Sequence, residues 1–481
     1  MNAFQVYING IFADAASGAT SPVINPATGE TVFTVPKCGA EELNAAVDAA
    51  HEAQKLWQRK TPMERGVFLR AFIAELRNSV DRLAEILSLE QGKTLKQSRG
   101  EILRACEMGE YHLGWDRRIT GEVLSGESSR ENIFLLKEPV GVVACIMPWN
   151  FPLLILIRKA APALMAGCTV VCKPSSDTPA STLELARLAH KAGFPKGVFN
   201  VISGSGAVLG DAIAKNKKVA MVTATGSVPM GQEIMRASAD SLKRVSLELG
   251  GKCPAVVMAD ADLDLAADCI VGSRLANAGQ VCTAVERAYV QKPVSEAFIA
   301  KVLERMAKAT YGDGVRNPDH TMGAMINRAS VERVHGMVER AVAQGATLLF
   351  GGVMPEGKGA FYPPTLLTNV KQDSEIIQEE VFGPVLPVVE FTTPEEALTL
   401  ANDCQYGLTS TLYTEDYNTI MLFMNSIESG ELYVNRQQRE AFHGYHAGWK
   451  LSGIGGDDGR HGMEEFLKPR TVYLDYATSL Y

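Results

Sequence analysis

The sequence predicts an α/β protein with two sheet-containing domains and a small additional β element. Three observations support this prediction. Apolar strands alternate with helices from residue 140 to about 250, a second such pattern runs from 253 to about 440, and a strand pair interrupts the helices at 121–139. Because such alternation is typical of βαβ units and a parallel sheet, the first pattern predicts a doubly wound, Rossmann-type domain. A chain of 481 residues is also long enough for two or three domains.

The first 120 residues are expected to form short strands followed by helices. Strands are predicted at 5–8 and 32–35, and the Asn, Pro and Gly residues of 25–29 favour a turn between them. From residue 40 to about 113, apolar residues recur every three or four positions, which predicts helices. These helices are 41–57, 62–78 and 80–91.

The segment 121–139 breaks the helical pattern and is expected to form a hairpin. Residues 122–126 and 133–136 are its strands, with a polar loop between them. Because a lone hairpin is marginally stable in water, this one is expected to pack on another chain or on another part of this one.

The first alternating pattern contains two glycine-rich turns at strand–helix junctions. They are 203–210, with the spacing G-x-G-x-x-x-G, and 225–231. Such glycines are commonly structural, but a helix N-terminus can also hold a phosphate group. The predicted strands are 140–146, 169–172, 198–202 and 221–223, and the helices begin near Pro152, Pro179, Ala207 and Pro229.

The second alternating pattern continues to the C-terminal region. Its predicted elements are strands at 255–258 and 286–290, helices at 263–275, 295–311 and 328–344, and a final strand at 471–474. We find no internal repeat and no low-complexity segment.

Composition excludes several classes of function. A net charge of −8 gives no basic face for nucleic acid, and the longest apolar run, 140–147, is too short to span a bilayer. The first twelve residues are predicted to form a strand and a turn rather than a signal peptide, so we expect a cytoplasmic protein without membrane contacts. None of the nine cysteines forms a C-x-x-C pair, so reduced thiols and no zinc site are expected.

A carboxylate and a thiol, Glu248 and Cys282, dominate the functional interpretation. Each lies beside glycines, which allow another molecule to approach the backbone closely. A thiol and a carboxylic acid at one place can form a covalent intermediate and then hydrolyse it.

Six ordered motifs resemble the aldehyde dehydrogenase superfamily, and the resemblance covers essentially the whole chain. Arg158-Lys159 and the segment 444–456 are most similar to bacterial lactaldehyde and glycolaldehyde dehydrogenases, and succinate-semialdehyde dehydrogenases are also similar. The six motifs are PWNFP at 148–152, KPS at 173–175, TGS at 225–227, ELGGK at 248–252, GQVC at 279–282 and EEVFGP at 379–384.

The resemblance implies a cysteine mechanism. Cys282 is the expected nucleophile, Asn150 the donor to the oxyanion, and Glu248 the base that activates the hydrolytic water. The alternatives are a buried space-filling thiol, an asparagine that caps the helix starting at Pro152, and a solvated carboxylate.

The resemblance also implies NAD or NADP as cofactor. Lys173 is expected at the adenosine ribose and Glu380 at the nicotinamide ribose, although each could instead be an ordinary surface charge. The other expected cofactor contacts are Trp149, Ser176, Gly206, Gly226, Ser227, Leu249 and Phe382.

Two departures from the family pattern affect cofactor and substrate. Ser176 replaces a glutamate common in NAD-preferring relatives, so NADP is expected to be accepted, although Asp177 could restore some repulsion. Ala276 replaces an arginine common in succinate-semialdehyde dehydrogenases, which leaves Arg158 as the expected polar substrate contact and His446 as a second candidate. The alternatives are a helix-surface ion pair for Arg158 and a structural role for His446.

The combined prediction is an NAD(P)-dependent oxidation of a small polar aldehyde such as lactaldehyde or glycolaldehyde. The alternatives are an anionic semialdehyde dehydrogenase and a non-catalytic nucleotide-binding protein. By resemblance, residues 1–120 and 140–252 form the cofactor domain and 253–456 the catalytic domain. Residues 121–139 and 457–481 form an oligomerisation element, which implies a homodimer or homotetramer.

Overall fold

The computed structural model describes residues 2–476, and its largest sheet has eight strands. Its five central strands run parallel, in the order β12-β11-β8-β9-β10, and antiparallel strands flank them. Across the sheet the strands are β22 (Gly453–Ile454), β12 (Arg244–Glu248), β11 (Val219–Thr225), β8 (Val142–Ile146), β9 (Thr169–Lys173), β10 (Phe199–Val201), β2 (Val6–Ile8) and β3 (Ile11–Ala13).

Helices cover both faces of this sheet. Alternate residues of β8 enter two different cores: Val143 and Cys145 pack on one side, and Val142 and Ala144 on the other. This two-residue period is the reason a strand buried on both faces is continuously apolar. The helices on the first side are α2 (Pro62–Asn78), α3 (Val80–Gln91), α4 (Leu95–Leu113), α5 (Pro152–Ala166) and α6 (Ala180–Lys191). Those on the second side are α1 (Ala40–Trp57), α7 (Gly206–Lys215) and α8 (Val228–Ser238).

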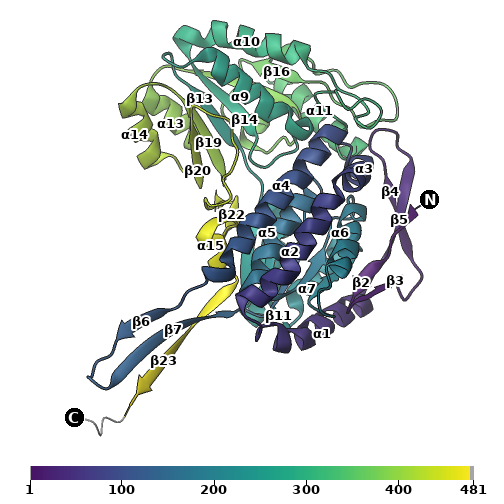
Figure 1. The fold of residues 1–481 in the computed structure, drawn as a ribbon. Helices are drawn as coiled ribbons and strands as arrows, with labels where there is room; N and C mark the ends of the chain where they lie inside the picture. Colours follow the sequence, from purple (N-terminus) through teal and green to yellow (C-terminus); the bar gives the residue numbers. More distant parts are fainter. Residues whose placement is uncertain (1, 477–481) are drawn as a thin grey trace.

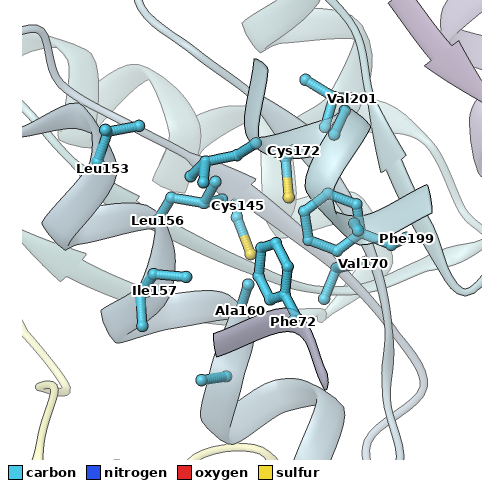
Figure 2. Close-up of a cluster of buried hydrophobic side chains, with 14 of the residues drawn as sticks. Phe72, Cys145, Leu153, Leu156, Ile157, Ala160, Val170, Cys172, Phe199 and Val201 are labelled. Carbon is cyan, nitrogen blue, oxygen red and sulfur yellow. The ribbon is translucent and has the colours of Figure 1, made fainter. Parts of the chain in front are cut away.

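Figure 2 shows part of the first core, where helix α5 packs on the sheet. Leu156 and Ala160 of α5 lie close to Cys145 and Cys172 of the strands, and Phe72 of α2 closes the cluster. These cysteines therefore fill space as small apolar residues, as the sequence predicted for most of the nine.

A second sheet of seven strands supports the other half of the molecule. All neighbouring strands are parallel except the edge pair β15–β16. The strands, in order, are β15 (Thr347–Phe350), β16 (Thr365–Thr368), β17 (Val385–Phe391), β14 (Val285–Gln291), β13 (Cys253–Val257), β19 (Thr409–Tyr413) and β20 (Glu431–Val434). The packed helices are α9 (Leu263–Leu275), α10 (Ser295–Lys308) and α11 (Arg328–Ala343) in one core, and α13 (Pro394–Asn402) and α14 (Tyr417–Ser426) in another.

A three-stranded sheet projects from the body of the molecule (Figure 1). The predicted hairpin, β6 (Glu122–Ser125) and β7 (Glu131–Pro139), pairs with the C-terminal strand β23 (Leu467–Asp475). The hairpin therefore has a partner within its own chain. The predicted element also includes residues 477–481, which lie outside the described residues, and the short helix α15 (Gly459–Glu464).

The remaining elements are short. They are β1 (Asn2–Ala3), β4 (Thr20–Ile24), β5 (Thr31–Pro36), β18 (Tyr406–Gly407), β21 (Trp449–Lys450), α12 (Glu375–Gln378) and the 3₁₀ turns Gly114–Arg117, Ala239–Ser241, Ala276–Gly279 and Lys292–Val294. Across residues 2–476, no helix combines the length and apolarity that a bilayer crossing requires.

The structure confirms the predicted α/β class and nearly all predicted elements. The helix predicted at 295–311 ends earlier, at Lys308, and the final strand is longer than 471–474. One strand crosses the predicted domain division, because β22 lies within 253–456 and yet pairs with β12 of the first sheet. The division into cofactor and catalytic domains stays a prediction.

Candidate active site

The functional residues gather at the carboxyl ends of the first sheet's strands, where open α/β sheets place their ligands. Trp149 and Asn150 follow β8, Lys173 ends β9, and Ser227 and Glu248 mark the ends of β11 and β12. A cavity of about 990 Å³ opens there. Of the fourteen predicted site residues, eleven line it: Trp149, Asn150, Lys173, Ser176, Gly206, Gly226, Ser227, Leu249, Cys282, Glu380 and Phe382.

Cys282 is carried by a loop with unusual backbone geometry. Asn277, Ala278 and Gly279 have φ values of 48°, 53° and 77°, so two non-glycine residues occupy the left-handed region. Such conformations persist only where the surroundings hold them. Arg274 donates to the Gly279 and Val285 carbonyls on either side of the cysteine. These bonds hold the loop on both sides of Cys282.

Asn150 points its amide toward the same loop. Its Nδ2 donates to the Gln280 carbonyl at 3.0 Å, and the side chain is 6% exposed. The alternative of a helix cap is wrong in detail, because Phe151 is the N-cap of α5 and α5 has no side-chain cap. The Asn150 amide is thus held against the loop that carries Cys282.

Cys282, which lines the cavity, forms one cluster with Glu248 and His446, which are buried behind it. Glu248 Oε1 accepts from Cys282 Sγ at 3.2 Å and lies 3.1 Å from His446 Nε2, while its Oε2 accepts from Thr225 Oγ1 at 3.0 Å. His446 Nδ1 lies 3.2 Å from Glu431 Oε1. The two residues predicted as nucleophile and base are therefore in direct contact.

The charges in this cluster shift one another's acidity. Burial and the Glu248 carboxylate raise the pKa of Cys282 to about 12, although His446 opposes them. Burial alone would raise the pKa of Glu248. The positive charges of His446, Arg158 and Lys159 outweigh this effect, so the pKa lies below its usual value. For His446, burial alone would lower the pKa of the imidazole. The Glu248 carboxylate outweighs this effect and raises the pKa well above its usual value. The resting cluster thus favours a protonated thiol, an ionised carboxylate and an imidazolium.

The glycines of the two motifs serve contacts within the chain. A Cβ on Gly251 would collide with the Cys282 carbonyl, one on Gly279 with the Gly383 carbonyl, and one on Gly250 would lie 2.7 Å from Glu380 Oε2. The sequence predicted room for another molecule, whereas these positions bring three distant segments of the same chain together.

The cavity wall on the side of Lys173 combines this lysine with two helix N-termini. Lys173 is 4% exposed, and burial lowers its pKa to about 8. The exposed Ser176 donates to the Gly204 carbonyl at 3.1 Å. Ser227 caps α8 by accepting from the Met230 N–H at 3.4 Å, and α7 begins at Gly206. Free N–H groups and a cation suit a phosphate-bearing ligand.

Another wall of the cavity presents Glu380 and an aromatic pair. The rings of Trp149 and Phe382 meet edge to face, with centroids 5.4 Å apart. Glu380 Oε1 accepts from the Gly251 N–H at 2.8 Å, and burial and Glu286 raise the pKa of its carboxyl to about 7.

Sequence reasoning missed the buried carboxylate that supports both the cysteine loop and this wall. Glu286 pairs with Arg274 at 2.6 Å and Lys252 at 2.8 Å, and it accepts from the Val381 and Phe382 N–H groups. In the sequence, the only signal for Glu286 is that it lies four residues after Cys282.

The third residue outside the cavity is Arg158. It is 4% exposed, and its guanidinium pairs with the Asp458 carboxylate at 2.9 Å. The expected alternative of an ion pair is therefore present, although it is buried rather than on the helix surface.

Comparison with known proteins agrees with this geometry, because residues 12–472 match the aldehyde dehydrogenase family. The chain belongs to this family. It is 44% identical to a lactaldehyde dehydrogenase of Escherichia coli over 98% of both chains. A crystal structure of lactaldehyde dehydrogenase from that organism superposes with a TM-score of 0.97, over 98% of this chain and 99% of that one.

Two other relatives act on different aldehydes, by their names. A 3,6-anhydro-alpha-L-galactose dehydrogenase of Vibrio sp. is 41% identical over 99% of this chain and 100% of its own. An NADP(+) succinate-semialdehyde dehydrogenase of E. coli is 38% identical over 96% of both chains.

The chain is therefore an NAD(P)-dependent aldehyde dehydrogenase, and the alternative of a non-catalytic nucleotide-binding protein is set aside. The residues fit NAD or NADP, since the cavity combines two helix N-termini, the Lys173 ammonium and the Glu380 carboxyl. A Cβ on Gly226 would lie 2.5 Å from Met230 Cε, so the glycine allows the turn to pack against this side chain of α8.

Proposed function

We propose that the enzyme oxidises a small polar aldehyde, of the lactaldehyde or glycolaldehyde kind, to its carboxylic acid. The observation that carries the proposal is the contact among Cys282, Glu248 and His446 at the inner end of the cavity. The nucleophile lies beside an ionised carboxylate, which can take its proton and later activate water, and beside an imidazolium, whose charge stabilises the thiolate.

The chemistry follows from these residues. Cys282 loses its proton to the neighbouring base and attacks the aldehyde carbon, while Asn150 Nδ2 donates to the developing oxyanion. Bound NAD or NADP, held by Lys173 and Glu380, supplies a hydride acceptor. Glu248 then takes a proton from the water that attacks the Cys282 thioester, which releases the acid and restores the thiol.

The state of Arg158 supports a neutral substrate over an anionic semialdehyde. Its guanidinium is already paired with Asp458, so a distal carboxylate would have to displace a buried ion pair. The His446 ring also lies between two carboxylates rather than facing an open space. Arg158 and His446, the two residues predicted to contact the substrate, are therefore already paired with carboxylates of the same chain.

Steady-state kinetics with lactaldehyde, glycolaldehyde and succinate semialdehyde, each with NAD and NADP, tests the proposal. We expect kcat/KM for a hydroxyaldehyde to exceed that for succinate semialdehyde at least about tenfold, or ~1.4 kcal/mol. The matched variant Arg158→Gln should lower the activity on all three substrates together. A selective rise in KM for succinate semialdehyde in that variant would instead favour the anionic substrate.

We also propose that NADP is accepted, because the exposed Ser176 places no carboxylate at its position.

We propose further that the projecting sheet joins a second copy of the chain. Apolar surface is exposed on this sheet by Val123, Leu124, Tyr473 and Leu474. Sedimentation should give a dimer or tetramer, and Leu124→Glu with Tyr473→Glu should shift it toward monomer. An unchanged mass would contradict the assembly.

All nine cysteines are free, in keeping with a cytoplasmic location.

A further inference from the structure

Three side chains that bind metals well converge in the cluster behind the cavity. Cys282 Sγ, His446 Nε2 and an oxygen of Glu248 all lie within 4.8 Å of one another, and residues 2–476 contain no other such group of three. They come from three distant parts of the chain: the end of β12, the loop after the turn Ala276–Gly279, and the loop after β20.

The spacing of these atoms is close to that of a tetrahedral zinc site. With bonds of about 2.3 Å to sulfur and 2.0–2.2 Å to nitrogen and oxygen, tetrahedral ligands lie about 3.4–3.6 Å apart. Glu248 Oε1 lies 3.2 Å from Cys282 Sγ and 3.1 Å from His446 Nε2. These two separations are a few tenths of an ångström shorter than the zinc values, and Cys282 Sγ lies within 4.8 Å of His446 Nε2.

The groups around the cluster already orient the ligands. Glu431 Oε1 contacts His446 Nδ1 at 3.2 Å, which leaves Nε2 directed at Glu248 and Cys282. Tyr433 holds the other Glu431 oxygen at 2.8 Å, and Thr225 holds the second oxygen of Glu248 at 3.0 Å. A carboxylate on the far nitrogen of a ligating histidine is the usual support of a zinc-bound imidazole.

Access and charge also suit the site. Cys282 lines the cavity, while Glu248 and His446 are 2% and 1% exposed, so the open fourth position would face the cavity and take a water. A thiolate, a carboxylate and a neutral imidazole would balance a divalent charge. A thiolate and an imidazole favour Zn²⁺ over Mg²⁺ or Ca²⁺.

We propose that Cys282, His446 and Glu248 form a reversible Zn²⁺ site whose occupancy blocks the nucleophile. Binding releases the thiol proton and the proton between Nε2 and Glu248, with no change of oxidation state. The metal is an inhibitor and not a resident cofactor, because its sulfur ligand is the atom that must attack the aldehyde. This proposal goes beyond the proposed function and does not depend on which aldehyde is oxidised.

Thiol alkylation of the cofactor-free protein tests the site without measuring activity. The protein is treated with iodoacetamide with and without Zn²⁺, and labelling of each cysteine is followed by peptide mass spectrometry. We expect Zn²⁺ to protect Cys282 and a chelator to restore its labelling. Cys269 and Cys404 are likewise partly exposed and serve as internal controls that should label equally in both conditions.

Two variants with matched controls identify the ligands. Glu431→Gln should weaken protection about 10- to 100-fold in Zn²⁺ concentration, the usual effect of losing such a supporting group, and His446→Asn should weaken it at least as much. The controls are His443→Asn and Glu428→Gln, two exposed positions near His446 and Glu431 in sequence, which should behave as wild type. Each variant is compared with itself with and without metal, after cofactor binding has verified its fold.

Co²⁺ provides a second readout on the wild-type protein. A sulfur-to-cobalt charge-transfer band should appear and vanish in Cys282→Ser. Absence of both protection and this band, or equal protection of wild type and His446→Asn, would overturn the proposal. Aldehyde turnover is measured separately, so its failure would not be mistaken for failure of the zinc site.

Discussion

The two sides of Cys282 are built differently. On the open side, the cavity is lined by glycine turns, helix N-termini and a few polar side chains that follow the strands directly in sequence. On the buried side, Glu248, His446, Glu431 and the Arg158–Asp458 pair make a closed set of charges from distant segments. The comparison shows that local motifs can build a binding surface, whereas tuning a nucleophile requires charges brought together by tertiary structure.

The largest expected effect separates chemistry from binding. Cys282→Ala removes the one atom shared by both sides, so turnover should fall by on the order of 10⁴-fold or more, as for other enzymes that lose their nucleophile. Formation of reduced cofactor measures this loss. Cofactor affinity, measured by fluorescence titration, should change little because the cavity walls remain. Wild-type turnover in this variant would show that the two sides do not meet at Cys282.

A second variant removes the carboxylate that ties the Cys282 loop to the cavity wall on the open side. Glu286→Gln leaves Arg274 and Lys252 without their buried partner, which should lower the free energy of unfolding by about 3–5 kcal/mol. Denaturant unfolding measures the change. Glu375→Gln, which breaks the exposed pair with Arg340, is the control and should cost less than about 1 kcal/mol. If the two variants lost equal free energy of unfolding, Glu286 would not be the structural support of the Cys282 loop that we infer.

The pH dependence of cofactor binding tests the open side alone. The pKa of Glu380 is raised to about 7 and that of Lys173 is lowered to about 8. The carboxylate is lost as pH falls below about 7 and the ammonium as pH rises above about 8, so affinity should be highest between these values. One pH unit below the pKa of Glu380, or one unit above that of Lys173, cofactor affinity should have fallen by up to about tenfold.

Glu380→Gln sharpens this test. It should flatten the acid limb, and Glu379→Gln, on the exposed neighbour, should not. A wild-type affinity that is constant from pH 6 to 9 would contradict the assignment of these two charges to the cofactor.

The smallest expected effect concerns cofactor choice. Ser176→Glu adds a carboxylate at the exposed position near Lys173 and should repel a 2′-phosphate, shifting the ratio of kcat/KM for NADP and NAD about tenfold toward NAD, or ~1.4 kcal/mol. Kinetics with both cofactors measures the ratio. Ser175→Glu, one position away, is the control, and an equal shift there would mean that only bulk charge changed.

How much the sequence could predict follows the same division. Strand–helix alternation predicted both sheets, and residues such as Lys173 and Ser227 were found because they lie in short contiguous motifs that resemble those of the family. Glu431 and Glu286 carry no local pattern, since their roles depend on partners at His446 and Arg274 that only the fold supplies. Arg158 shows the limit most clearly: its residue type suggested an anion site, but its partner Asp458 lies 300 residues away.

Trapping the acyl-enzyme tests the central claim most directly. Glu248→Gln removes the base for thioester hydrolysis but leaves Cys282 and Asn150 in place. Because Glu248 also accepts the Cys282 proton, we expect that with aldehyde and cofactor one equivalent of reduced cofactor forms more slowly than in the wild type, and that the mass of the acyl group appears on the peptide that contains Cys282. Steady turnover without any acylated peptide, or an acyl group on another cysteine, would contradict the account.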